Sequence, residues 1–226
     1  MTSEEKELHI AIDGPAASGK TTVGKLVAKK INALFFDTGL VYRSATWFLL
    51  KNGCALTDSH EVMSCLEKMH LTLQNNPETQ ETEILINGVS VSKELHLPNI
   101  DKHVSIVSAI PEVRQLLTSL QREIGLKGRT VLVGRDIGTV VLPDADIKVY
   151  LKASAETRAL RRFEENQKNG IESSYQDILT DLIRRDQIDS SRQTAPLKAA
   201  ADAHILNTDD LTADKVAERI LELVNG

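Results

Sequence analysis

The sequence is poor in aromatic residues and has no excess of positive charge. Of its 226 residues only 4% are aromatic, and 32 acidic residues outnumber 27 Lys and Arg, giving a formal net charge of −5. Proteins that bind nucleic acid usually show an overall basic excess, and those that bind single strands often interleave basic residues with aromatic side chains on which bases stack. Neither feature occurs here, so we expect no nucleic-acid partner.

Cysteines and long apolar runs are also scarce. The two cysteines, Cys54 and Cys65, are too few for a disulfide framework and have no metal-ligand spacing. Residues 1–13 lack the basic start and apolar stretch of a signal peptide. No apolar run reaches the length of about 18 residues that a membrane span needs. We therefore expect a cytoplasmic protein with no membrane partner and, since coiled-coil heptads are absent, a monomer.

Short apolar runs alternate with helical periodicity along most of the chain. Hydrophobic residues make up 41% of the sequence and charged residues 26%, as in ordinary globular proteins. The apolar runs predict strands at residues 8–13, 33–37, 130–134, 147–151 and 203–207. Apolar residues at helical spacing predict helices at residues 18–31, 112–124, 155–169, 175–189 and 212–224. This order is typical of a mostly parallel sheet covered by helices on both faces.

Residues 71–95 interrupt this alternation. They have no helical period, but β-like runs occur at residues 71–73, 83–86 and 89–91, and Asn87-Gly88 is a strong hairpin signal. We predict a small antiparallel insert between the second and third strands of the main sheet. Residues 75–82 show no pattern.

A phosphate-binding loop follows the first predicted strand. Gly14, Gly19, Lys20 and Thr21 match the pattern G-x-x-x-x-G-K-[ST]. Glycines let backbone N–H groups point at phosphate oxygens, and the helix that follows adds the partial positive charge of its N-terminus. Lys20 would reach the β- and γ-phosphates, and Thr21 would offer an oxygen to Mg²⁺. The pattern predicts binding of a nucleoside triphosphate.

The motifs of switch GTPases and of motor ATPases are missing. No N/T-K-x-D or D-x-x-G motif occurs, and the run "VLVGRD" ends without the Asp-Glu pair of many ATPases. Three alternatives stay open at this point. They are a kinase acting on a nucleotide, a small kinase acting on a metabolite hydroxyl, and a nucleotide-binding regulator that transfers nothing.

Arginines recur where the predicted strands end. Arg43 follows the second strand, although a helix beginning near Thr38 explains it equally well, and Arg135 and Asp136 follow the third strand. Arg158, Arg161 and Arg162 share one helix face, as do Arg185, Asp189 and Arg192. Surface ion pairs also explain such stripes. Phosphoryl transfer between two anions, however, needs positive charge around the gap.

Taken together, the motifs resemble those of the bacterial cytidylate kinases, within the nucleoside monophosphate kinase group. The resemblance rests on "IAIDGPAASGKTT", "FFDTGLVYR", "GRDIGTVVLPDADIKVYLKASAETRALRR" and "RRDQIDSSRQTAPLKAAADAHILNT". It implies an α/β P-loop kinase that converts ATP and CMP or dCMP to ADP and CDP or dCDP in pyrimidine metabolism. It also implies a core at residues 1–37, 115–154 and 173–226, a monophosphate-binding insert at 38–114 and a short helical lid at 155–172.

The resemblance also implies a set of site residues. ATP, with Mg²⁺ held by Thr21, phosphates and water, would contact Gly14, Pro15, Ala16, Ala17, Ser18, Gly19, Lys20, Thr21, Thr22 and Arg162. CMP would contact Thr38, Tyr42, Arg43, Ser105, Arg114, Arg135, Asp136, Arg185, Asp189 and Arg192. Within that set, Ser105, Arg114 and Asp136 would face cytosine, and Arg185 and Asp189 the sugar hydroxyls. The catalytic charges would be Lys20, Arg135, Arg158 and Arg192.

Overall fold

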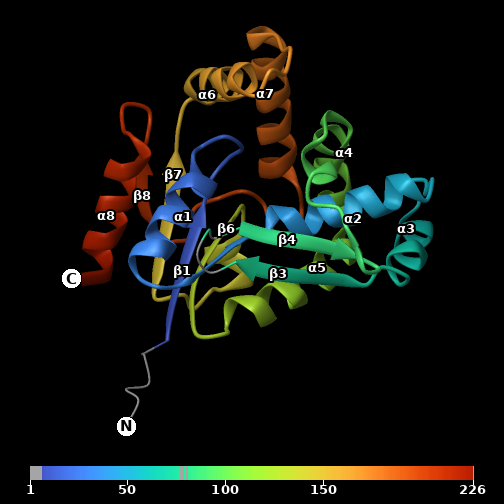
Figure 1. Cartoon of the computed structure of the whole chain (residues 1–226), viewed down its shortest axis with the longest axis horizontal. Helices are drawn as coiled ribbons and strands as arrows, with labels where there is room; N and C mark the ends of the chain where they lie inside the picture. Colours follow the sequence, from blue (N-terminus) through green and yellow to red (C-terminus); the bar gives the residue numbers. More distant parts are fainter. Residues whose placement is uncertain (1–6, 77–78, 80, 226) are drawn as a thin grey trace.

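The computed structural model describes residues 7–76, 79 and 81–225 of the chain (Figure 1). Residues 1–6, which contribute to the argument against a signal peptide, lie outside the described residues, as does part of the segment 75–82. None of the described helices is long and apolar enough to cross a membrane.

The main sheet has five parallel strands in the order β2-β6-β1-β7-β8. Their bounds are Leu8–Asp13 for β1, Leu34–Asp37 for β2, Arg129–Gly134 for β6, Ile147–Lys152 for β7 and His204–Asn207 for β8. All five strands were predicted from the sequence to within a residue at either end. Their apolar runs are unbroken where both faces of the sheet are covered by helices.

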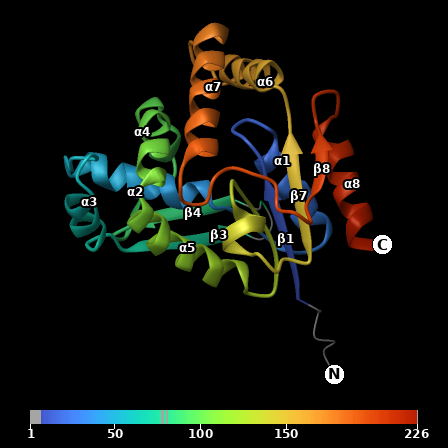
Figure 2. The ribbon, with the colours of Figure 1, turned by 180° about the vertical axis from the view of Figure 1, so that it is seen from behind.

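Helices cover both faces of this sheet. Along β1, Ile10 and Ile12 pack with α1 (Lys20–Lys30) and α8 (Ala213–Asn225), whereas Ala11 belongs to the cluster that includes α5 (Pro111–Gly125). This alternation is the period of two expected of a strand. The helices α6 (Ala155–Lys168) and α7 (Tyr175–Ser191) pack against each other beyond the carboxyl ends of the strands (Figures 1 and 2). The predicted mostly parallel, two-faced fold is therefore confirmed.

The insert between β2 and β6 lies at the end of the molecule opposite α8 (Figure 2). Its helices are α2 (Gly39–Lys51), α3 (Ser59–Leu66) and α4 (Pro98–Ala109), and a 3₁₀ turn covers Glu94–His96. Its antiparallel sheet joins β3 (Leu71–Asn76), β4 (Glu81–Ile86) and β5 (Val89–Ser90) in that order. Asn87 and Gly88 both have positive φ, 51° and 78°, as a type I′ hairpin turn requires. The predicted antiparallel insert is confirmed; α3 and α4 were not predicted.

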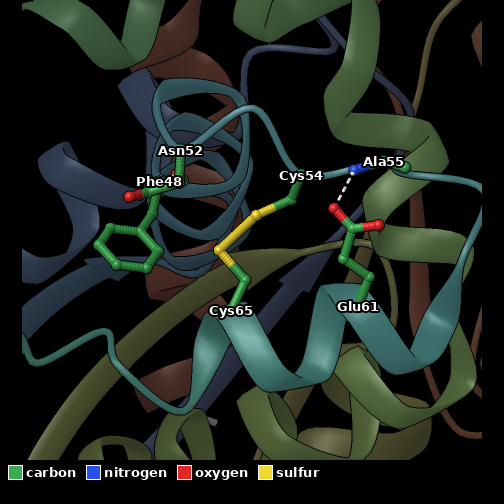
Figure 3. The surroundings of a disulfide bond; sticks show 6 residues. All are labelled: Phe48, Asn52, Cys54, Ala55, Glu61 and Cys65. Atoms are coloured by element: carbon green, nitrogen blue, oxygen red, sulfur yellow. Dashed lines mark hydrogen bonds between the residues drawn. A yellow bond between two sulfur atoms is a disulfide. The ribbon is translucent and has the colours of Figure 1, made fainter.

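The two cysteines are paired, which the sequence analysis did not foresee. Cys54 follows α2 and Cys65 lies on α3, and a disulfide joins them (Figure 3). Beside it, the carboxylate of Glu61 accepts a hydrogen bond of 2.9 Å from the backbone N–H of Ala55. The pairing arises because the chain reverses after α2 and lays α3 back against that helix, a tertiary contact that two isolated cysteines do not reveal.

Candidate functional site

The phosphate loop lies between β1 and α1, at the carboxyl edge of the sheet. Gly14 has φ 152°, and a Cβ there would overlap the carbonyl oxygen of Leu151, so this position requires glycine. Ala17 and Gly19 also have positive φ, 57° and 91°. The loop ends at the N-terminus of α1, whose first N–H groups have no partners within the helix. This geometry is suited to an anion.

Lys20 is folded back over the loop. Its Nζ donates to the carbonyl oxygen of Pro15 at 2.6 Å and to Ser18 Oγ at 3.4 Å. Burial, and next the charge of Arg135, hold the pKa of Lys20 well below its ordinary value. A bound phosphate would have the opposite effect, because a nearby anion favours the charged amine.

Arg158 reaches the same loop from α6. Its Nη1 donates to the carbonyl oxygen of Ala16 at 3.1 Å, and the guanidinium also pairs with Asp186 of α7. The side chain is buried, with a residue exposure of 3%. Arg158 therefore links the loop to the two helices above the sheet.

Thr21 lies beside a carboxylate that the sequence analysis did not single out. Its hydroxyl donates to Asp37 Oδ2 at 2.8 Å, and Asp37 Oδ1 accepts the N–H of Gly39 at 2.9 Å. A hydroxyl and a carboxylate oxygen are the hard donors that Mg²⁺ prefers, so these residues fit the ion. The described residues contain no group of three or more His, Cys, Asp or Glu side chains placed to hold a metal.

A buried ion pair stands on the other side of the site. Arg114 of α5 donates through Nη2 to Asp136, just after β6, and through Nη1 to the carbonyl oxygen of Ser108 at 3.2 Å. Arg114 is 2% exposed and Asp136 4%. The Arg114 guanidinium also lies 5.3 Å from the centre of the Tyr42 ring. Three predicted site residues from distant parts of the chain are thus brought together.

Arg192 connects this pair to a second carboxylate. Its Nη2 lies 3.5 Å from Asp136 Oδ1 and its Nη1 lies 3.7 Å from Asp189 Oδ1. Asp189 also accepts from Arg135 Nε at 2.8 Å. Burial alone would raise the pKa of Asp189, but the charges of Arg135 and Arg185 outweigh it and hold that pKa below the ordinary range. Asp189 is therefore ionised at neutral pH.

Arg43 and Arg185 share a third carboxylate, Asp101 of α4. Asp101 Oδ1 lies 2.6 Å from Arg43 Nη2 and 3.5 Å from Arg185 Nη1. Burial, followed by the charge of Arg135, lowers the pKa of Arg185 to about 10. Within the described residues, the buried Nε of Arg185 and Nη2 of Arg192 have no hydrogen-bond partner. Buried donors without partners are costly, so this side of the site is suited to an anionic ligand.

The model of the cytidylate kinase family matches residues 10–226 of this chain. The chain belongs to that family. A cytidylate kinase of Corynebacterium glutamicum is 44% identical over 220 residues, which are 97% of this chain and 95% of that enzyme. One from Bacillus velezensis is 43% identical and covers 97% of each chain. The resemblance drawn from the motifs is thereby confirmed, and with it the assignment to the nucleoside monophosphate kinases, which are phosphotransferases.

A solved structure shares the fold of this family member at low sequence identity. It is described as an uncharacterized protein from Eubacterium ventriosum, and it aligns with a TM-score of 0.50 over 97% of this chain and 99% of its own. The two sequences are 14% identical. At that identity the likeness shows a common architecture and nothing about substrates.

Three further residues of the predicted site are Thr38, Ser105 and Arg162, and each makes contacts within the protein. Thr38 is buried and its hydroxyl donates to the carbonyl oxygen of Val133 at 2.9 Å, so it joins the start of α2 to β6. Ser105 is buried on α4, where its carbonyl oxygen accepts from Ser108. Arg162 is partly exposed and lies 3.5 Å from Glu165, one turn further along α6.

The residues that the sequence analysis missed are acidic partners of the predicted cations. Asp101 and Asp186 neutralise arginines across helices; Asp101 lies outside every quoted motif, whereas Asp186 lies within "RRDQIDSSR" but was not singled out. Asp13 and Asp37 are the last residues of β1 and β2, at the same edge as the phosphate loop. Their position at strand ends was a readable signal, because ligands of such sheets bind beyond the carboxyl ends of the strands.

Proposed function

We propose that this enzyme transfers the γ-phosphoryl group of ATP to the phosphate of CMP or dCMP, giving ADP and CDP or dCDP. The observation that carries the proposal is the buried Arg114–Asp136 pair, placed on the same edge of the sheet as the phosphate loop. Family membership supports the reaction. The geometry supports a nucleotide acceptor, because the Arg114–Asp136 pair can bind the base of a nucleotide, whereas a small hydroxyl acceptor has no base to bind.

On the donor side, ATP phosphates are received by the backbone of residues 14–21 and by Lys20. Arg158 supports this loop from α6 through the carbonyl oxygen of Ala16. In the proposal residues 155–172 form a lid, to which Arg162 belongs, that excludes water from the transferring group. The core and the monophosphate-binding insert keep the proposed bounds, 1–37, 115–154 and 173–226 for the core and 38–114 for the insert.

On the acceptor side, the CMP phosphate lies among arginines. Tyr42, Arg43, Arg135 and Arg192 surround it, and the buried Nη2 of Arg192, which makes no hydrogen bond within the described residues, supports that placement. A nucleotide phosphate carries close to two negative charges at neutral pH and is itself a nucleophile, so no general base is required. Catalysis then consists of positioning and charge neutralisation by groups already in place.

The base and the sugar are read by carboxylates. An oxygen of Asp136 accepts from the exocyclic amino group of cytosine, with Arg114 and Ser105 beside it. Asp189 accepts from the sugar hydroxyls and Arg185 orients it. Uracil presents an oxygen where cytosine presents the amino group, and two acceptors facing each other lose their water without compensation.

Mg²⁺ completes the proposed site. Thr21, with Asp37 beside it, would hold the ion together with ATP phosphates and water, and the ion would supply positive charge next to the transferring group. We expect the enzyme to work in the cytoplasm as a monomer.

A coupled assay of ADP release with a panel of nucleoside monophosphates tests the proposal. We expect rapid ADP release with CMP and dCMP and at most slow release with UMP, AMP and GMP. Slow release that no nucleotide stimulates would instead indicate a regulator that only hydrolyses its triphosphate. Stimulation by metabolite alcohols, with none by nucleotides, would indicate a kinase for a non-nucleotide acceptor.

A further inference from the structure

Asp13 is a buried carboxylate at the end of β1, next to Gly14 of the phosphate loop. Its residue exposure is 3%. The two carboxylate oxygens accept the backbone N–H groups of Ile137 and Gly138, at 2.7 Å and 2.8 Å. A carboxylate that binds two successive N–H groups fixes the orientation of the backbone that carries them.

That backbone is a single π-helical turn, Ile137–Val141. The first N–H groups of any helix have no partners inside it, and here Asp13 supplies partners for two of them. Arg135 and Asp136 immediately precede the turn; Asp136 pairs with Arg114 of α5, and Arg135 pairs with Asp189 of α7. The placement of these two site residues therefore depends on where the turn is held.

We infer that Asp13 is a positioning residue that fixes the turn after β6, and with it Arg135 and Asp136, in register with the phosphate loop. The inference rests on the proposed function. Asp13 touches neither substrate in this assignment; it joins the donor side to the acceptor side through one carboxylate.

The electrostatics of Asp13 agree with a geometric role. Burial raises its pKa to about 6, while the two N–H bonds and Lys20 oppose the rise and Asp136 adds to it. The fold is therefore favoured with Asp13 protonated, below the ordinary Asp range, and loses that stabilisation as the pH rises through about 6. At neutral pH the ionised Asp13 lowers the free energy of unfolding, yet its two oxygens still hold two backbone N–H groups. Asp13 therefore contributes to the placement of the turn and not to stability.

The test compares Asp13→Asn with a control variant that changes another carboxylate accepting a backbone N–H of the same protein. The Asn oxygen accepts one N–H, but its NH₂ group opposes the other. We expect KM for CMP to rise at least ~10-fold and the CMP-to-UMP ratio of kcat/KM to fall, as for the loss of one hydrogen bond to a charged group. KM for ATP should change by less than about threefold, since the loop backbone keeps its contacts. Asp146→Asn is the control, because Asp146 accepts the N–H of His9, near the other end of β1, at 2.8 Å.

A merely structural role predicts a lower Tm for Asp13→Asn with KM for CMP and the CMP-to-UMP ratio unchanged, and that result would overturn the inference. If Asp13→Asn does not fold, Asp13→Glu keeps the charge but moves the oxygens by one methylene, and the same split in KM is expected. Hydrogen exchange of the wild-type protein gives a reading without any variant, since rapid exchange at Ile137 and Gly138 contradicts the bonds. Wild-type protein that does not phosphorylate CMP would overturn the proposed function instead.

Discussion

The donor side and the acceptor side of the site are built in opposite ways. The proposed donor side is a continuous stretch, residues 14–21, in which backbone N–H groups at the start of α1 would contact the phosphates. The proposed acceptor side is assembled from side chains of α2, α4, α5, α7 and the end of β6, which are spread along the chain from Gly39 to Ser191. A loop made of backbone is encoded locally, whereas a pocket made of side chains depends on the whole fold.

The two sides also balance charge differently. Lys20 faces carbonyl and hydroxyl oxygens and has no ion-pair partner among the described residues, so its charge is free to meet phosphate. The arginines of the acceptor side are each paired with Asp101, Asp136 or Asp189. Buried ion pairs add little stability because desolvation offsets their attraction. Their contribution here is to hold arginines in place before a substrate arrives.

The largest effect should follow from removing the free charge on the donor side. Lys20→Ala should lower kcat by at least ~10²-fold, because a preorganised charge acts on the transferring phosphoryl group. Lys29→Ala, at an exposed position near the end of the same helix, is the control. Steady-state kinetics with circular dichroism checks the result. A near-normal kcat for a folded Lys20→Ala protein would contradict the assignment.

The next effect concerns base identity on the acceptor side. Asp136→Asn should lose most CMP activity and narrow the CMP-to-UMP ratio of kcat/KM by at least ~10-fold, about the value of one hydrogen bond to a charged group. The new NH₂ group can donate to the uracil oxygen that the carboxylate repels. The test measures kcat/KM for CMP and for UMP with the wild-type and Asp136→Asn proteins. Asp144→Asn, at an exposed position, is the control. An unchanged ratio with lower overall activity would mean that Asp136 places Arg114 and Arg192 and does not read the base.

A smaller effect should change KM for the acceptor nucleotide without changing KM for ATP. Asp189→Ala should raise KM for CMP and dCMP about fivefold, close to the value of one hydrogen bond, and leave KM for ATP nearly unchanged. Asp181→Ala, on the exposed part of α7, is the matched control. A change in KM for ATP without one for CMP would reduce Asp189 to an ion-pair partner of Arg135.

The smallest kinetic effect should come from breaking the disulfide, which lies only on the acceptor side of the molecule. Reducing Cys54–Cys65, or replacing both with Ser, should lower the free energy of unfolding by about 2–3 kcal/mol, because the bond closes a short loop. That corresponds to a fall in Tm of roughly 5–10 °C for a chain of this size. KM for ATP should not change. Calorimetry with and without dithiothreitol gives the answer, and equal Tm values would mean that the cysteines are unpaired in solution.

The contrast between locally encoded features and features that depend on the whole fold explains which elements could be predicted from the sequence. The five strands of the main sheet and the Asn87-Gly88 turn were predicted because each depends on a local pattern. The helices α3 and α4, the Cys54–Cys65 pair and the partner carboxylates were not, because each depends on chain segments that meet only after folding. Asp136 was predicted from its position after the third strand and Arg114 only from the family resemblance, since nothing within either segment predicts that they pair.

The order of strands in the main sheet has a consequence for how the chain folds. The central strand, β1, is made first, yet its neighbours are β6 and β7, and residue 8 pairs with residue 129. Closing so long a loop is slow, whereas the hairpin of β3 and β4 forms from neighbouring residues. During synthesis on the ribosome, β1 therefore cannot pair with either neighbouring strand until the insert and β6 have emerged. The phosphate loop takes its final shape only after the chain has passed β7, whose Leu151 lies against Gly14.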